Sequence, residues 1–164
     1  MKDWLVGGAV LVGPDGVLLV QNLRRGGQLD WTTPGGVIET HEGETLLEGL
    51  RREVEEETGL RVASWKHQVY EVVVEAPALG WRLRAECWLA DEWTGELRCG
   101  DDPDGIVVDA RFVDVADCPV LLETVHPWVR EPLGEWLVEQ WTVSRPYAYE
   151  VSGSDRATMA VVRR

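Results

Sequence analysis

The sequence predicts an α+β fold, an α/β/α sandwich in which a sheet lies between helices on opposite faces. Most of the chain consists of short apolar or alternating runs bounded by glycine and proline, a pattern typical of strands. Only two segments have apolar residues at helical spacing, and a series of strands separates them. A chain of 164 residues, 45% of them hydrophobic, is long enough to form one domain with its own core.

The first part of the chain is predicted to form a hairpin and a loop. Residues 4–12 and 17–20 are apolar runs, and the Pro14-Asp15-Gly16 turn between them favours an antiparallel pair. A polar loop starts at residues 24–27 and ends with Pro34-Gly35-Gly36, which requires a tight backbone. This loop leads into the first helical segment.

The first predicted helix spans residues 45–58. Thr45 and Glu48 form a capping-box pattern at its start, and Gly59 suits the left-handed conformation that ends many helices. The apolar side chains of this segment share one side of the helix: Leu46, Leu47, Leu50 and Val54. One face of the helix is therefore expected to pack against the sheet.

The middle of the chain is predicted to complete the sheet. Residues 62–75 and 81–90 are expected strands joined by a turn at residues 77–80. An acidic loop at residues 101–105 precedes a further strand at residues 106–113.

The second helix and a C-terminal segment follow. The helix starts near Pro127 and has apolar residues at helical spacing: Trp128, Leu133, Trp136, Leu137 and Trp141. Residues 1–144 are expected to form the domain, and residues 145–164 a C-terminal hairpin or mobile tail.

Charge and cysteine content limit the partners and the compartment. A formal net charge of −13 argues against long nucleic acids and anionic membranes as partners, because both repel an acidic protein. A small anionic substrate remains compatible if a bound divalent cation reverses the local charge. The three cysteines have no C-x-x-C spacing, no apolar run reaches about 20 residues, and no signal peptide is visible. A cytoplasmic protein with reduced cysteines is expected.

Three glutamates in the first helix carry the strongest chemical signal. Glu53, Glu56 and Glu57 are spaced i, i+3 and i+4, so a helix places them on one patch at the rim of the core. Their mutual repulsion destabilises the helix unless a cation offsets it, and hard cations such as Mg²⁺ bind carboxylate oxygens. For the helix alone, the alternative is a solvated acidic face with Arg51 and Arg52 as ion-pair partners.

The surrounding residues resemble the Nudix hydrolase superfamily of MutT-like proteins. Its signature is G-x5-E-x7-R-E-U-x-E-E-x-G-U, in which U is a bulky aliphatic residue. From Glu44 onward every fixed position matches, ending in Arg52-Glu53-Val54-Glu55-Glu56-Glu57-Thr58-Gly59-Leu60. Many fixed positions at fixed spacing make this motif a specific signal.

The chain departs from the signature before Glu44. Seven residues lie between Gly36 and Glu44 where the family has five, so the loop around Thr40-His41-Glu42 is two residues longer. A loop that bulges outward leaves the helix intact. Whether the Gly36 carbonyl still reaches a metal depends on the path of this longer loop. His41 is either an added ligand or base, or an exposed loop residue.

The resemblance implies a mixed, curved sheet between helices and hydrolysis of a nucleoside diphosphate linked to another group X. Water attacks phosphorus while Mg²⁺, or Mn²⁺ in its place, holds the diphosphate. The implied metal ligands lie in the loop and on the helix: Gly36, Glu53, Glu56 and Glu57. The resemblance also gives catalytic roles to Glu53 and Glu57, and to Arg52 with Glu44, which it orients. The general base is either Glu53 or an aspartate of a later loop: Asp101, Asp102, Asp104 or Asp109.

Substrate contacts and competing functions are less specific. Arg24 and Arg25 either clamp a phosphate or are ordinary loop arginines, and Trp31 either stacks on a base or packs at the core. The substrate class includes sugar nucleotides, ADP-ribose, dinucleoside polyphosphates and oxidised nucleoside triphosphates. The alternatives to an enzyme are a catalytically silent Nudix-like nucleotide-binding module and an acidic interaction domain. Nine tryptophans supply large apolar anchors, compatible with a homodimer.

Overall fold

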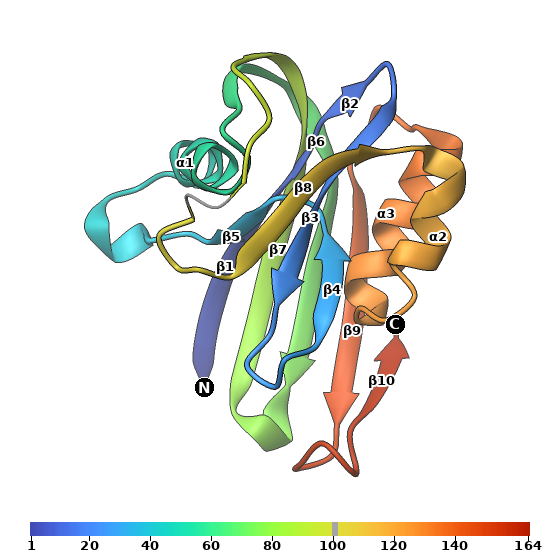
Figure 1. Ribbon diagram of the computed structural model, residues 1–164. Coiled ribbons are helices and arrows are strands. Elements are labelled where there is room, and N and C mark those ends of the chain that lie inside the picture. The colour runs from blue at the N-terminus through green and yellow to red at the C-terminus, as the bar shows by residue number, and fades with distance from the viewer. Residues whose placement is uncertain (100–101) are drawn as a thin grey trace.

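The computed structural model describes residues 1–99 and 102–164 and contains two β-sheets (Figure 1). The strands of the larger sheet are, in spatial order, β10 (Ala160–Arg163), β9 (Arg145–Ser152), β6 (Arg61–Ala76), β7 (Trp81–Thr94), β1 (Lys2–Val10) and β5 (Gly35–Val37). The smaller sheet pairs β3 (Gly16–Leu23) with β2 (Val12–Gly13), β4 (Leu29–Thr32) and β8 (Val107–Val113). Strand β1 runs parallel to β7 and β9 parallel to β6, so the larger sheet is mixed.

Helices lie on two sides of the sheets. Helix α1 (Leu46–Thr58) lies on one side, and α2 (Cys118–Leu121) and α3 (Pro127–Glu139) lie on the other (Figure 1). Three short 3₁₀ turns complete the elements: η1 (Thr40–Glu42), η2 (Pro77–Leu79) and η3 (Val115–Asp117). The predicted α+β fold with helices on opposite faces is confirmed. Within the described residues, no helix has the length and apolarity needed to cross a bilayer.

Two hydrophobic clusters correspond to the two helical layers. Leu50 and Val54 of α1 are fully buried in the cluster that contains Leu18 of β3. Leu133 and Trp136 of α3 belong to the larger cluster, which takes residues from both sheets. Burying one such side chain stabilises the fold by roughly 1.5–3 kcal/mol, so these buried side chains hold α1 and α3 against the sheets.

The bounds of α1 follow its local sequence signals. The Thr45 side chain accepts the backbone N–H of Glu48 at 3.2 Å, and its hydroxyl donates to the Glu48 carboxylate at 2.8 Å. Gly59 adopts φ 78° and donates its N–H to the Glu55 carbonyl, which ends the helix. The predicted cap residues therefore act at both ends.

Several segments differ from the prediction or add to it. The loop predicted for residues 24–36 contains the strands β4 and β5. The first strand ends at Val10, because the chain passes from the larger sheet into β2 of the smaller one after Leu11. Helix α2 was not predicted, since its four residues are too few to show a helical period. The C-terminal segment forms the β9–β10 hairpin, and β9 extends the larger sheet beside β6. The domain boundary at residue 144 stays a prediction.

Candidate active site

Strand β5 and helix α1 bring two carboxylates against a glycine backbone. Gly35 donates its N–H to Glu57 Oε1 at 3.1 Å. A Cβ added at Gly36 would lie 3.1 Å from the carboxyl carbon of Glu53, so this carboxylate packs directly on Gly36. Only 9% of Glu53 and 4% of Glu57 are exposed, while Glu56 is half-buried. The structure therefore brings Gly36, Glu53 and Glu57 together as the sequence predicted.

Glycine at position 35 is required by the close approach of β5 to β1. Gly35 has φ +150°, and a Cβ at this position would lie 2.0 Å from the carbonyl oxygen of Gly7. A larger residue would force β5 away from β1 and displace the N–H that Glu57 accepts. The Pro-Gly-Gly turn thus positions the site through its backbone.

Arg52 connects Glu44 to the glutamate patch. Its guanidinium donates two hydrogen bonds to Glu44, from Nε at 2.7 Å and from Nη2 at 3.0 Å. Its third nitrogen lies 3.3 Å from Glu53 Oε1 and 3.2 Å from Glu56 Oε2. The hydrogen bonds from Arg52 are the main reason that the pKa of Glu44 is lowered. Arg52 is therefore placed to orient Glu44, the arrangement that the motif implied.

Burial disfavours the charged forms of the Glu53 and Glu57 carboxylates when no cation is bound. Loss of solvent raises the pKa of Glu57 to about 9, although the Gly35 N–H opposes the shift. Loss of solvent also raises the pKa of Glu53 to about 7, against the opposing charge of Arg52. Glu53 and Glu56 raise the pKa of Glu57 further through repulsion. A cation at this patch would offset both the burial and the repulsion.

The donor set fits a hard divalent cation. In the described ranges 1–99 and 102–164, no three acidic, histidine or cysteine side chains already form a cluster that could hold an ion. Mg²⁺ usually takes one or two carboxylates and completes its coordination with water and substrate phosphates, so the buried pair Glu53 and Glu57 suits it. The full ligand set of Gly36, Glu53, Glu56 and Glu57 stays a prediction.

The candidate substrate residues lie on the β3–β4 hairpin, where Arg24 and Trp31 are already engaged in contacts within the protein. Arg24 donates to both carboxylate oxygens of Asp30, at 2.8 and 2.9 Å. Asp30 also accepts a hydrogen bond from the buried side chain of Asn22, a polar centre that the sequence patterns did not single out. Arg25 is exposed. Trp31 is 8% exposed and belongs to the core, and Arg111 lies 4.9 Å from its ring centroid, which favours packing over base stacking.

The acidic loop that precedes β8 lies beside α1. The negative charge of Asp102 raises the pKa of Glu57, and that of Asp104 raises the pKa of Glu53. The carboxylate of Asp102 accepts the N–H groups of Asp104, Ile106 and Val107, so it orders its own loop. Asp109 pairs with Arg111, whose hydrogen bond lowers its pKa. Asp101 lies outside the described residues.

Comparison with known proteins decides the family. A family model described as the NUDIX domain matches residues 4–137. The chain belongs to the Nudix family. No curated protein matches it. The motif-based recognition and the predicted fold and enzyme class, a Nudix pyrophosphohydrolase, are therefore confirmed.

Solved structures agree with this assignment. A MutT Nudix hydrolase from Burkholderia pseudomallei is 23% identical, with TM-score 0.64, over 87% of this chain and all of its own. The mutator MutT protein from Bacillus halodurans is 19% identical, with TM-score 0.66, over 98% of this chain and 97% of its own. An ADP-ribose pyrophosphatase from Streptococcus suis is 21% identical, with TM-score 0.57, over 87% and 98% respectively. At these identities the likeness is one of fold.

The two extra residues of this Nudix chain bulge outward as η1. His41 is 74% exposed in its side chain, and its ring nitrogens lie 3.5 Å from Glu39 and 3.8 Å from Glu42. Glu39 donates its backbone N–H to Glu44, so the loop returns to the helix. The insertion therefore leaves Gly36 packed on Glu53.

We expect His41→Ala to leave kcat and the pH–rate profile unchanged, because the His41 ring is exposed and pairs with Glu39 and Glu42 of its own loop. Steady-state hydrolysis between pH 6 and 9 would measure both. A change in the profile that is absent from Glu42→Gln, the matched exposed neighbour, would show that the insertion supplies a catalytic group.

Proposed function

We propose that this chain hydrolyses the diphosphate linkage of a nucleoside diphosphate joined to a second group X, with Mg²⁺ or Mn²⁺ as cofactor. The observation that carries the proposal is the buried pair Glu53 and Glu57, packed on the Gly35–Gly36 backbone in a Nudix motif whose fixed positions are all present from Glu44 onward. Two buried carboxylates with raised pKa values are unfavourable in a protein that has no use for a cation there.

Each residue of the site has a distinct task in this proposal. Glu53, Glu56, Glu57 and the Gly36 carbonyl would hold the ion, which would supply positive charge to neutralise the phosphates and to acidify the attacking water. Arg52 fixes Glu44 through its two hydrogen bonds and steadies Glu53 and Glu56. The base that takes a proton from the attacking water is Glu53 or an aspartate of the acidic loop, which lies beside α1.

The names of the structural relatives frame the substrate panel. They include an ADP-ribose pyrophosphatase, which makes ADP-ribose a first substrate, and MutT proteins, whose names state no substrate. Oxidised nucleoside triphosphates stay in the panel because the motif resemblance implies them. Sugar nucleotides and dinucleoside polyphosphates complete the class.

The competing function is a Nudix-like nucleotide-binding module without catalysis. Such a module can dispense with motif carboxylates, whereas this chain retains all of them from Glu44 to Glu57. The complete set therefore favours the enzyme.

The deciding experiment measures release of phosphate and nucleoside monophosphate from this panel with Mg²⁺, with Mn²⁺ and with EDTA. Turnover that requires the metal supports the enzyme. Thermal stabilisation by a nucleotide without any turnover identifies the binding module. A folded protein that responds to neither metal nor nucleotide contradicts both functions. Homodimerisation and cytoplasmic location remain predictions of the sequence.

Arg52→Lys tests the positioning role of the guanidinium. A lysine keeps the charge but cannot donate the paired hydrogen bonds that hold Glu44. We expect kcat to fall by about 10–100-fold, as for other residues that orient metal ligands, with little change in KM. Steady-state kinetics at saturating Mg²⁺ would measure this. Arg51→Lys, an exposed neighbour on the same helix, is the matched control and should retain wild-type activity.

A further inference from the structure

Asn22 of β3 is a buried polar side chain without a task in the proposed hydrolysis. The described residues include three other buried polar or charged side chains, Glu53, Glu57 and Thr58. Glu53 and Glu57 form the candidate metal site, and the Thr58 hydroxyl bonds the backbone at the end of α1. Burying an amide costs free energy unless its polar atoms are hydrogen-bonded. The hydrogen bonds of Asn22 therefore indicate its role.

Two hydrogen bonds fix the orientation of the Asn22 amide. Its nitrogen donates to Asp30 Oδ1 at 3.0 Å and to Thr32 Oγ1 at 2.9 Å, which uses both N–H groups. Asp30 is held in turn by Arg24, through hydrogen bonds of 2.8 and 2.9 Å. A flipped amide would point its oxygen at the Asp30 carboxylate, which would repel it. The network therefore presents the Asn22 carbonyl oxygen as an acceptor in one direction.

Two polar groups of this network remain for a ligand. Among residues 1–99 and 102–164, no donor bonds the Asn22 carbonyl oxygen, and this oxygen keeps access to solvent. Thr32 accepts a hydrogen from Asn22, and its own hydroxyl hydrogen has no acceptor within the same ranges. Only 6% of Asn22 is exposed, and a hydrogen bond is stronger in such surroundings than in open water. An acceptor and a donor therefore lie side by side on neighbouring strands.

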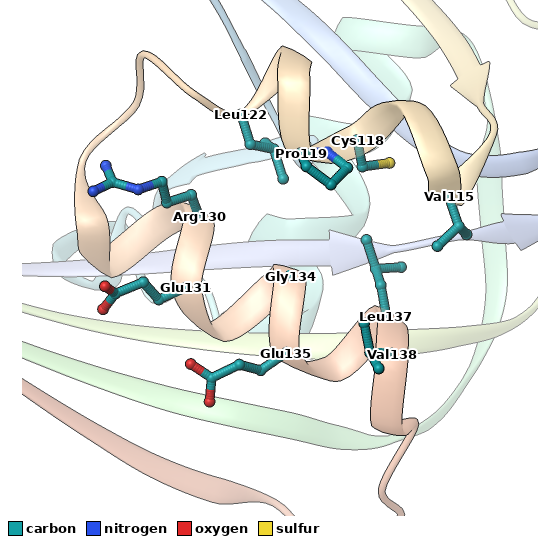
Figure 2. A pocket seen from close by; sticks show the side chains of 10 residues that line it. All are labelled: Val115, Cys118, Pro119, Leu122, Arg130, Glu131, Gly134, Glu135, Leu137 and Val138. Atoms are coloured by element: carbon teal, nitrogen blue, oxygen red, sulfur yellow. The ribbon is translucent and has the colours of Figure 1, made fainter.

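The network lies on the face of the smaller sheet that is directed toward α1. Strand alternation places Asn22 on the same face as Leu18, and Leu18 packs in one cluster with Leu50 of α1. The opposite face carries Trp31, which belongs to the same cluster as Leu137 of α3 (Figure 2). The free acceptor and donor are therefore on the side of the candidate metal site.

Two segments connect the network to Glu57. Thr32 lies at the end of β4, three residues before Gly35, whose N–H Glu57 accepts. On the other side of β3, a β-bulge places Val107 of β8 beside the network. The Asp102 carboxylate accepts the Val107 N–H at 2.9 Å, and its charge raises the pKa of Glu57. A nucleotide with its diphosphate at the glutamate patch can therefore extend toward this network.

We propose that Asn22 and Thr32 recognise the nucleobase of the substrate whose diphosphate binds at the glutamate patch. The Asn22 carbonyl oxygen accepts an N–H of the base, and the Thr32 hydroxyl donates to a neighbouring ring nitrogen or carbonyl. Base edges carry donors next to acceptors, so the two groups are complementary to them. Arg24 and Asp30 are positioning residues that hold the amide. The inference rests on the proposed function, which brings a nucleotide to this site.

The test uses the full chain and measures calorimetric binding of AMP, GMP, CMP and UMP together with hydrolysis of the substrate panel. For the preferred base, Asn22→Ala and Thr32→Val should each weaken binding at least about tenfold. In hydrolysis the loss should appear in KM, with kcat within about twofold of wild type, because the base is remote from the reacting phosphorus. Thr32→Ser keeps the hydroxyl and should bind as the wild type does.

Two controls separate base recognition from other effects. Gln28→Ala removes an exposed amide from the same hairpin and should leave binding unchanged. Ribose 5-phosphate has no base, so wild type, Asn22→Ala and Thr32→Val should bind it equally. If Asn22→Ala melts early, Thr32→Val decides, because valine keeps the branched shape that suits a strand.

The outcomes separate this inference from the proposed hydrolysis. Hydrolysis by the wild type with unchanged KM and monophosphate binding in both variants would overturn the inference alone. An equal loss of ribose 5-phosphate binding would also overturn the assignment to the base. Monophosphate binding that depends on Asn22 and Thr32, without any product release, would support the base site and contradict the hydrolysis. A wild type that neither binds a monophosphate nor hydrolyses the panel would overturn both.

Discussion

Glu57→Gln is expected to reduce metal-dependent hydrolysis by at least about 100-fold, because Glu57 is a metal ligand in the proposed function and loss of a ligand should exceed the 10–100-fold effect of losing a residue that supports one. Glutamine has nearly the same shape and can still accept the Gly35 N–H, so the contact between α1 and β5 should survive. It cannot supply the negative charge that a buried divalent cation requires. The defect should appear in kcat at saturating substrate and should not be rescued by higher Mg²⁺.

The matched control is Glu55→Gln, on the same helix but outside the glutamate patch. Glu55 pairs with Arg61 at 2.9 Å on an exposed surface, so its loss should leave kcat within about twofold of wild type. If Glu57→Gln kept full activity while remaining folded, the catalytic metal would have to lie elsewhere. If both variants lost activity equally, the effect would be one of net helix charge and not of metal ligation.

Features encoded over short distances could be predicted from the sequence. The cap residues Thr45 and Gly59 set the bounds of α1 because they act on the backbone within one turn of the helix. The Arg52–Glu44 pair was predictable because a family motif fixes its spacing. The strand alternation of residues 81–90 likewise located β7, although the strand continues to Thr94.

Features that depend on distant packing could not be predicted. Helical spacing places Glu53, Glu56 and Glu57 on one patch, but only the position of β5 decides that Glu53 and Glu57 are buried and Glu56 is not. The pairing of Arg24 with Asp30 depends on the register of β3 with β4, which no short motif specifies. The position of α2 beside α3 likewise could not be predicted, because a helix of four residues is too short to leave a sequence signal.

The metal-free protein is expected to lose stability as the pH rises from 6 to 8.5. Burial raises the pKa of Glu53 to about 7 and that of Glu57 to about 9, above the value of 4.5 that applies in the unfolded chain. A carboxyl whose pKa is raised by folding contributes most below its unfolded pKa, and the contribution is lost as the pH rises through the folded pKa. Across this window the loss should be on the order of 3 kcal/mol, or a fall of roughly 10 °C in Tm.

This window avoids most of the other groups whose pKa is shifted. The lowered pKa values of Glu44, Asp109 and Glu135 affect stability at more acidic pH, and the raised pKa of Cys87, about 12, affects it only above pH 9. Burial lowers the pKa of His126 from its ordinary value of 6.5, so this group destabilises the fold only below that pH and opposes the trend only at the acidic edge of the window.

Thermal melts in EDTA and in Mg²⁺, on wild type and Glu57→Gln, would measure this dependence. Mg²⁺ binds the ionised carboxylates, so its stabilising effect should grow with pH and offset most of the loss. Glu57→Gln removes the group with the larger shift and should be more stable than wild type at pH 8.5 in EDTA, with a weaker pH dependence. A wild-type Tm that does not change with pH in EDTA would contradict the raised pKa values of Glu53 and Glu57. A Tm that falls with pH but does not respond to Mg²⁺ would support the burial of Glu53 and Glu57. It would contradict their role as metal ligands.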